Sequence, residues 1–387
     1  MYSHIIIHYD EITLKGGNRP FFERALVNNI REFLKEIECG NLYREGGKII
    51  VEIVKDTDLK KIKKILKNIP GISNFYFAVS EKKDLEKINK KTVKLLQDYL
   101  KTEDKKTFKI EARRSDKKFE LKSPQINAIV GEYVLENTKL TVDVHHPDIE
   151  IVVEIGQKNC YVYFEKTSGI GGLPIGTTGK LISLISGGID SPVASYMMNK
   201  RGAKIIFVHF KNKTINDIGN DKIKDLVKKL NRFQGKSKLY IIPFEEFQKE
   251  IIANIPSKNR MIVYRRIMFK LAGEIAKKEK AKGFVTGDSL SQVASQTLEN
   301  INVIYNAANL PIFSPLIGMN KQEIIDISKK INTYDISILP YQDCCSFLIA
   351  KHPETKADLK IILKQEKNLK INKIAEKIIA EIKPEVI

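Results

Sequence analysis

The feature that most constrains the fold is a short apolar run that leads into a glycine turn near the middle of the chain. Residues 181–185 read Leu-Ile-Ser-Leu-Ile, residues 186–192 read Ser-Gly-Gly-Ile-Asp-Ser-Pro, and a helical pattern starts at residue 193. A buried strand, a turn and a helix start in this order direct backbone N–H groups at a bound anion. Glycine lets phosphate oxygens approach the backbone closely, and Pro192 suits the first helical turn, where its missing N–H is not needed.

We therefore predict a phosphate site at this turn, formed by Ser186, Ser191 and the N–H groups around Gly187 and Gly188. Asp190 is predicted to hold the Mg²⁺ that accompanies a nucleotide. The turn is neither a Walker P-loop nor a dinucleotide fingerprint. It resembles the SGGxDS loop of the PP-loop pyrophosphatases, which cleave ATP between the α and β phosphates and adenylate a substrate. The alternatives are a tight turn without a ligand and, for Asp190, a role as helix cap.

Strands and helices alternate regularly beyond the linker. Strands are expected at 181–186, 204–210, 238–242 and 283–286, and helices at 193–200, 221–233, 245–254 and 258–278. This alternation predicts a doubly wound parallel sheet, whose ligands bind beyond the carboxyl ends of the strands. Leu184 and Ile185 precede the turn, and His209 and Phe210 end the second strand, so we expect these four residues to contact the adenine and ribose.

The other parts of the chain have a different pattern. Residues 1–58 and 59–167 mix short strands with amphipathic helices, and residues 149–155 and 160–164 are predicted to form a hairpin. Ser123 is the expected cap of a helix over 123–135. Residues 168–180 contain five glycines within a dozen positions and are expected to link these domains to a catalytic domain over 181–387. The lysine-rich stretch 354–380 predicts a surface helix.

The charge of the chain favours a polyanionic partner. The formal net charge is +19, of which residues 1–180 carry +6 and residues 181–387 carry +13, and residues 51–130 alone carry +9. A basic surface of this size is typical of nucleic-acid binding; the alternative is a lysine-rich composition that aids solubility. No run of 18 uncharged apolar residues occurs, and the N-terminus has no signal-peptide pattern, so we expect a cytoplasmic protein without a membrane partner.

The four cysteines do not indicate a disulfide framework. Cys39 and Cys160 are most simply structural, whereas Cys344 and Cys345 are adjacent. No C-x-x-C pair occurs, so a zinc ribbon or a self-contained iron–sulfur motif is not favoured.

Several long motifs resemble those of the tRNA 4-thiouridine synthetases. Residues 9–23 resemble the N-terminal ferredoxin-like signature of that family, although Asp10 stands where glycine is usual. Residues 108–135 resemble the core of a THUMP domain, which binds RNA. The remaining matches are the interdomain segment 165–180, the PP-loop at 186–196, and the segments 286–298, 315–325 and 340–345. The fold class implied is an N-terminal ferredoxin-like domain and a THUMP domain, followed by a doubly wound PP-loop ATP pyrophosphatase domain.

The resemblance implies an ATP-dependent tRNA sulfurtransferase. Such an enzyme adenylates O4 of uridine 8 in tRNA, releases pyrophosphate, and replaces AMP with sulfur carried as a persulfide from a cysteine desulfurase. Many relatives also supply thiamine synthesis by forming a thiocarboxylate on a small carrier protein. Relatives act as homodimers, so we expect a homodimer.

The resemblance also implies roles for individual residues. Arg265, Gly287 and Gln296 match nucleotide contacts, with neighbouring Arg266 left to solvent or tRNA, and Lys321 matches a lysine that neutralises phosphate charge. Sulfur transfer needs a nucleophilic thiolate, and Cys344 and Cys345 lie in the matched segment; the sequence does not decide which of them carries sulfur. The tRNA contacts are expected at Lys15, Asn18, Arg19, Arg113, Arg114, Lys117, Lys118 and Lys122, which would hold phosphates rather than read bases.

The chain departs from the longer family members at its C-terminal end. The sequence printed ends 42 residues after Cys345, so we expect a short form without the rhodanese domain that carries a second active cysteine in some relatives. Sulfur would then come directly from a desulfurase, or as sulfide through an iron–sulfur cluster. The missing C-x-x-C makes the cluster the less favoured route.

Other functions compatible with the sequence are an adenylating ligase or amidotransferase that acts without sulfur, and a tRNA-binding protein without catalysis. A THUMP-bearing methyltransferase is disfavoured because no glycine-rich S-adenosylmethionine loop is visible. Replacing both Cys344 and Cys345 with serine would separate a sulfurtransferase from a ligase.

Overall fold

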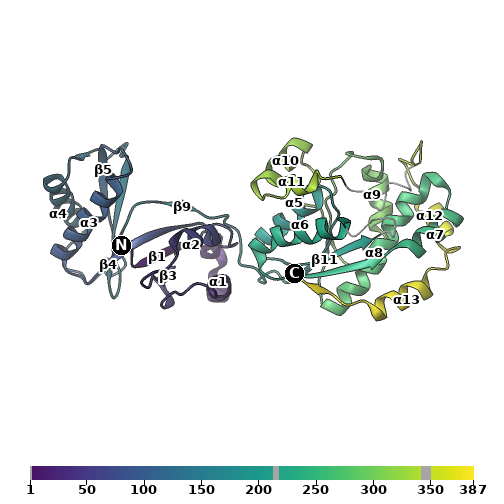
Figure 1. Cartoon of the computed structure of the whole chain (residues 1–387), viewed down its shortest axis with the longest axis horizontal. Helices are drawn as coiled ribbons and strands as arrows, with labels where there is room; N and C mark the ends of the chain where they lie inside the picture. Colours follow the sequence, from purple (N-terminus) through teal and green to yellow (C-terminus); the bar gives the residue numbers. More distant parts are fainter. Residues whose placement is uncertain (1, 212–217, 341–349) are drawn as a thin grey trace. The chain divides into compact units, whose positions relative to one another are not determined.

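The computed structural model describes residues 2–211, 218–340 and 350–387, with side chains of the helix at 218–234 described from residue 221. It comprises two compact units, Met1–Gly172 and Leu173–Ile387 (Figure 1). The division falls inside the glycine-rich segment 168–180. No helix among the described residues is both long and apolar enough to cross a bilayer.

The first unit is built on one nine-stranded sheet within residues 2–172, in the order β2-β3-β1-β4-β8-β7-β5-β6 with β9 paired to β4. Its elements are β1 (His4–His8), a 3₁₀ helix (Glu11–Asn18), α1 (Arg19–Leu34), β2 (Leu42–Glu45), β3 (Lys48–Glu52), α2 (Leu59–Leu66), β4 (Asn74–Glu81), α3 (Leu85–Leu100), β5 (Thr107–Arg114), α4 (Ser123–Asn137), β6 (Thr141–Val142), β7 (Ile149–Ile155), β8 (Cys160–Tyr163) and β9 (Thr167–Ser168). The predicted hairpin is confirmed, because β7 and β8 pair antiparallel.

Two hydrophobic clusters divide this unit into two halves. Helices α1 and α2 cover β1, β3 and β4, whereas α3 and α4 cover β5, β7 and β8. The predicted cap of α4 is wrong by one residue: the helix includes Ser123, and the N–H of Lys122 before it donates to Gln125 Oε1 at 2.8 Å. Lys48 on β3 and Glu154 on β7 form a buried ion pair that joins the two halves.

The second unit contains a six-stranded sheet in its described residues, in the order β14-β13-β10-β11-β12-β15. Its elements are β10 (Lys180–Leu184), α5 (Asp190–Lys200), β11 (Lys204–Lys211), α6 (Ile218–Gln234), β12 (Lys238–Pro243), α7 (Glu245–Asn254), a 3₁₀ turn (Ser257–Asn259), α8 (Arg260–Glu279), β13 (Phe284–Val285), a 3₁₀ turn (Ala294–Gln296), α9 (Leu298–Tyr305), β14 (Ile312–Phe313), α10 (Lys321–Lys330), α11 (Tyr334–Ser337), α12 (Leu359–Glu366), α13 (Asn372–Glu381) and β15 (Glu385–Val386).

The order of the strands confirms the predicted doubly wound sheet. Strand β10 lies between β11 and β13, and both pairings are parallel. Strand β11 is the next strand in the sequence, whereas β12 and the helices α6, α7 and α8 separate β11 from β13. The chain therefore reverses its direction of winding at β10, and ligands of open α/β sheets bind at such a switch point. Helices α5 and α6 pack on one face of this sheet and α8 on the other (Figure 1).

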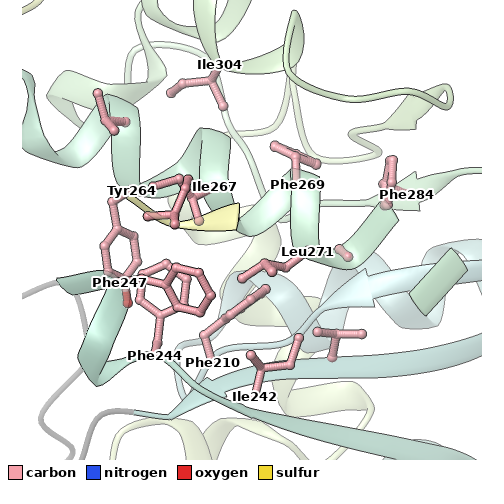
Figure 2. Close-up of a cluster of buried hydrophobic side chains, with 14 of the residues drawn as sticks. Phe210, Ile242, Phe244, Phe247, Tyr264, Ile267, Phe269, Leu271, Phe284 and Ile304 are labelled. Atoms are coloured by element: carbon pink, nitrogen blue, oxygen red, sulfur yellow. The ribbon is translucent and has the colours of Figure 1, made fainter. Parts of the chain in front are cut away.

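The core on the α8 side explains why that helix is long and apolar. Leu271 projects from α8 toward the strand residues Phe210 and Ile242, and Tyr264 packs against Phe244, as Figure 2 shows. Because successive strand side chains alternate between faces, Ile182 joins this core while Ser183 points the other way and contacts Ser195 Oγ of α5 at 2.8 Å.

The C-terminal stretch differs from the prediction of one surface helix over 354–380. It forms two helices, α12 and α13, and α12 buries Ile362 and Glu366 against α8. The last residues add β15, which pairs antiparallel to β12 and covers an edge of the otherwise parallel sheet. Because edge pairing needs a partner distant in sequence, the two-residue strand had no local signal.

Candidate active site

The predicted loop closes on itself through its two serines. Ser186 N–H donates to Ser191 Oγ at 2.9 Å, and Gly188 N–H donates to Ser186 Oγ at 3.3 Å. Ser191 Oγ also lies 3.2 Å from Ser186 Oγ. The serine hydroxyls thus fix the turn that leads into α5, and the helix N-terminus provides the positive end of a dipole there.

Asp190 is the first residue of α5, with Ile189 before it as the cap residue, so Asp190 is not the helix cap. Its Oδ1 accepts from Lys321 Nζ at 2.6 Å, and its Oδ2 accepts from Gln292 Nε2 at 3.0 Å. Lys321 begins α10, where Asn320 and Glu323 form a reciprocal capping box that fixes the helix start. The structure therefore brings together Asp190 and Lys321, which are 131 residues apart in the sequence.

Gly287 follows β13 and lies directly against the start of α5. A Cβ at this position would lie 2.8 Å from both the Asp190 carbonyl carbon and the Ser191 nitrogen. Two adjacent strands of the sheet end here, and the glycine lets their following segments meet at the switch point. This need for glycine comes from packing within the protein.

A cavity of about 530 Å³ opens beside the loop, within the range of roughly 300–1,000 Å³ usual for small-molecule sites. One wall comes from α8, which contributes Met261, Arg265 and Met268 at helical spacing. The cavity is lined by Leu184, Ser186, Asp190, Ser191, Ser257, Lys258, Met261, Ile262, Arg265, Met268, Phe269, Thr286, Gly287, Asp288, Val293, Ala294, Ser295, Gln296, Ala350, Pro353 and Glu354. An apolar wall facing a polar loop suits a ligand with an aromatic base and a charged end.

A buried carboxylate organises the polar groups of this cavity. Both oxygens of Asp288 accept from Arg265 Nη2, at 2.8 and 2.7 Å, and Gln296 Nε2 donates to Oδ1 at 3.0 Å. Tyr305 donates its hydroxyl to Oδ2 at 2.8 Å. Burial alone would raise the pKa of Asp288, but the charge of Arg265 and these hydrogen bonds hold its pKa below the ordinary value. Burial, with Asp288 nearby, raises the pKa of Tyr305 to about 12.

Seven of the residues predicted to bind the nucleotide line this cavity: Leu184, Ser186, Asp190, Ser191, Arg265, Gly287 and Gln296. The other five, Ile185, Gly187, Gly188, His209 and Phe210, are not among its lining residues. The ring of His209 is buried, with Nδ1 2.9 Å from the Ile185 carbonyl oxygen, and Phe210 packs in the core against Phe244. Phe210 could therefore contact a nucleotide only through its main chain.

The two adjacent arginines of α8 lie in different surroundings. Arg265 lies in the cavity wall, whereas Arg266 is buried, with Nε 2.7 Å from Glu366 Oε1 and with a bond to the Val303 carbonyl. The prediction that Arg266 contacts solvent or tRNA is wrong. The helix turns by about 100° per residue, so neighbours face different surroundings.

Cys344 and Cys345 lie outside the described residues, so their predicted role remains a prediction. Cys160 is buried and Cys39 is partly buried, and burial raises the pKa of both thiols, to about 12 for Cys160. Within residues 2–211, 218–340 and 350–387, no group of three or more His, Cys, Asp or Glu side chains is arranged to hold a metal ion.

The predicted tRNA contacts divide into exposed cations and residues engaged in the fold. Lys117, Lys118 and Lys122 are exposed, as is Asn18. Arg113 is also exposed, but its Nε donates to Glu111 Oε1 at 2.9 Å. Arg114 instead donates to the carbonyls of Leu121 and Lys117, at 2.7 and 3.2 Å, and so closes the loop between them.

Near the N-terminus, two of the predicted tRNA contacts are also held by neighbouring side chains. Arg19 Nε donates to Glu23 Oε1 at 2.8 Å and Nη2 donates to the Tyr9 hydroxyl at 3.0 Å. Lys15 Nζ lies 5.1 Å from the centre of the Phe22 ring. These contacts orient both cations without removing them from the surface of the unit.

Sequence reasoning missed several lining residues. Met261 and Met268 lie one turn to either side of Arg265, so the match of Arg265 together with helical spacing could have found them. Asp288 directly follows the matched Gly287 but carried no separate signal. Pro353 and Glu354 reach the cavity through tertiary structure, and Asn300 holds this segment by donating to the Glu354 carbonyl at 2.7 Å.

Three family models match successive parts of the chain. The ThiI ferredoxin-like domain matches residues 4–76, the THUMP domain matches residues 82–165, and the model described as thiamine biosynthesis protein (ThiI) matches residues 176–371. With the fold and the loop described above, these matches define the class of protein: a THUMP-containing PP-loop protein of the ThiI type.

Full-length relatives identify the family within this class. A probable tRNA sulfurtransferase of Caldanaerobacter subterraneus subsp. tengcongensis is 41% identical over 98% of both chains, and one of Alkaliphilus oremlandii is 41% identical over 95% of this chain and 94% of its own. The crystal structure of a 4-thiouridine synthetase–RNA complex with bound ATP matches with a TM-score of 0.92 and 35% identity, covering all of both chains. The chain belongs to the tRNA sulfurtransferase family, and the recognition from sequence motifs is confirmed.

Proposed function

We propose that this protein is an ATP-dependent tRNA sulfurtransferase that converts uridine 8 of tRNA to 4-thiouridine. In the first step, uridine O4 attacks the α-phosphorus of ATP and pyrophosphate leaves. In the second step, a sulfur nucleophile attacks C4 and AMP leaves with the former O4. The observation that carries the proposal is the meeting of Asp190, Lys321 and the 186–191 loop at the switch point of the sheet.

Each part of the cavity has a task in the first step. The N–H groups of the loop and the N-terminus of α5 favour the negative charge of the phosphates. Lys321, fixed by its capping box and by Asp190, places a cation beside the same helix end. Electrostatic stabilisation by fixed donors and cations is the main protein contribution to phosphoryl chemistry. The apolar wall of α8 suits the adenine.

Mg²⁺ is compatible with the donors present. Mg²⁺ commonly binds one or two protein carboxylates together with substrate phosphates and water. Asp190 is the carboxylate placed at the loop, and it would hold the ion from the protein side. When bound, the ion would neutralise phosphate charge.

We assign the second step to Cys344 and Cys345. The terminal sulfur of a persulfide on one cysteine would attack C4, and the thiolate of the other would then break the remaining S–S bond, which releases the thiolated base and leaves a disulfide for a thiol reductant. A cysteine desulfurase is the proposed donor. Sulfide delivered through an iron–sulfur cluster is the alternative.

The first unit is proposed to bind tRNA. Its ferredoxin-like and THUMP domains, matched at residues 4–76 and 82–165, carry the exposed cations described above, and residues 181–387 carry the chemistry. The solved relative has RNA and ATP bound, which supports tRNA as the partner. We also propose a homodimer in the cytoplasm. The name of the ThiI model favours a second role, sulfur transfer to a carrier protein of thiamine synthesis.

The test is a thiolation assay with the purified chain, ATP, Mg²⁺, unmodified tRNA and either sulfide or a desulfurase with cysteine. We expect pyrophosphate release and the absorbance of 4-thiouridine in digested tRNA. Asp190→Asn and Lys321→Ala should each lower pyrophosphate release by about 10²–10³-fold, the range for losing one preorganised electrostatic group. Loss of thiolation but not of pyrophosphate release in the Cys344→Ser, Cys345→Ser double variant would support the sulfur step.

Two outcomes would contradict the proposal. Pyrophosphate release that yields no thiolated base with any sulfur source would favour an adenylating ligase. Binding of tRNA without pyrophosphate release would favour a binding protein without catalysis.

A further inference from the structure

Asp288 is the most highly connected carboxylate of the cavity, yet it has little access to a ligand. It is 3% exposed, and four hydrogen bonds from three side chains occupy its two oxygens. Two of these side chains, Arg265 and Gln296, line the cavity. The third, Tyr305, is not a lining residue, and its hydroxyl also lies 2.6 Å from Ser314 Oγ.

Asp288 determines how both lining side chains are oriented. A carboxylate accepts but does not donate hydrogen bonds, so the Gln296 amide must present its nitrogen to Asp288. The amide oxygen of Gln296 is buried and has no hydrogen-bond partner among the described residues. The bond to Asp288 is therefore what selects one of the two amide orientations. For Arg265, Nη2 contacts both carboxylate oxygens and Nη1 donates more weakly to the Ser295 carbonyl at 3.4 Å, so Asp288 provides the shorter, charged contacts that hold the guanidinium group.

The same short segment also touches the phosphate loop. Gly287 packs against the backbone of Asp190, and Asp288 follows it with its side chain directed toward α8. A strand end that contacts the loop with one residue and α8 with the next couples the two sides of the cavity. This coupling is rigid because Asp288, Tyr305, Thr286 and Ser314 form one connected hydrogen-bond network.

We propose that Asp288 is a positioning residue for nucleotide binding, which holds Arg265 and Gln296 in the arrangement that receives ATP. The inference rests on the proposed function, because it assumes that this cavity binds ATP. It predicts that Asp288 acts on affinity for ATP through its neighbours, without touching the reacting atoms.

The neighbouring pair Arg266–Glu366 offers a matched control. Its arginine lies on the same helix as Arg265, and its carboxylate is about as buried as Asp288. Neither residue of this pair lines the cavity. A merely structural role for Asp288 would make the two pairs behave alike.

The experiment measures the Kd of a nonhydrolysable ATP analogue, without tRNA, together with the urea midpoint of unfolding. In Asp288→Asn the new amide N–H₂ opposes a donor, so Arg265 or Gln296 must move. We expect a Kd about 10- to 100-fold higher, which is the effect of losing one hydrogen bond to a charged group. Glu366→Gln should lower the unfolding midpoint but leave the Kd within twofold of the wild type. Asp288→Glu, which keeps the charge, should restore part of the affinity.

A double variant tests the route of the effect. If Asp288 acts through Arg265, adding Asp288→Asn to Arg265→Ala should raise the Kd much less than it does alone. An unchanged Kd in Asp288→Asn, or equal effects on Kd in Asp288→Asn and Glu366→Gln, would overturn the inference. Failure of the wild-type protein to bind the analogue would instead overturn the proposed function.

Discussion

Replacing Gly287 with alanine should separate the packing role of a glycine from a ligand-binding role. The new Cβ would lie 2.8 Å from the Asp190 carbonyl carbon and from the Ser191 nitrogen. Both neighbours are backbone atoms at the start of α5, so no flexible side chain can move aside. Relief requires that the strand end and the helix start move apart.

The size of the effect follows from these distances. Ordinary contact begins at 3.4 Å, so the separation must grow from 2.8 Å by about 0.6 Å. Overpacking of this kind typically costs about 1–3 kcal/mol of unfolding free energy. The movement also displaces Asp190 from Lys321, and because a 1 Å misplacement can lower a rate about 10²-fold, we expect pyrophosphate release to fall roughly tenfold.

Gly188→Ala is the matched control for this variant. Among the described residues, a Cβ at Gly188 would meet Ser186 Oγ at 3.5 Å, an ordinary contact. We expect Gly188→Ala to unfold like the wild type but to raise the Km for ATP, because the added methyl group stands where phosphate is proposed to bind. The chain contains no tryptophan, so unfolding in urea is best followed by circular dichroism.

The reasoning is refuted if Gly287→Ala unfolds at the wild-type urea concentration with full activity. It is equally refuted if Gly188→Ala loses as much unfolding free energy as Gly287→Ala, since the two glycines would then share one role.

Two further predictions concern the first unit. Burial, followed by the charges of Lys48 and Arg113, lowers the pKa of His8 from 6.5 to about 4; the stability from neutral His8 is full above pH 6.5 and is lost as the pH falls toward 4, by at most about 3 kcal/mol. The unfolding free energy, measured in urea, should be lower at pH 5 than at pH 8 in the wild type, and this difference should be smaller in His8→Gln. An equal difference in both proteins would refute the prediction. Lys118→Ala should weaken tRNA binding and reduce its salt dependence by about one counterion, whereas Arg114→Ala should also lower the stability of the unit; an unchanged salt slope for Lys118→Ala would argue against a phosphate contact.

Local sequence patterns are sufficient for much of this fold. Helix α7 spans Glu245–Asn254, the range that its pattern predicts, and Asp58 caps α2 as side-chain acceptor for Lys61 N–H at 2.9 Å. Such elements are set by spacing and capping between residues a few positions apart. The C-terminal stretch shows the limit, because α12 is shaped by burial of Glu366 against Arg266, 100 residues away in the chain.

The sequence by itself determined three things: the anion-binding turn at 186–191, the alternation of strands and helices that predicts a parallel sheet, and the family to which the chain belongs. Only the tertiary structure decided which side chains meet. It paired Asp190 with Lys321, made Asp288 the common anchor of Arg265 and Gln296, and turned Arg266 into the core beside Arg265. The physical reason is that periodicity fixes the face on which a residue lies, whereas its partner depends on the order of strands and on helix packing across long sequence separations.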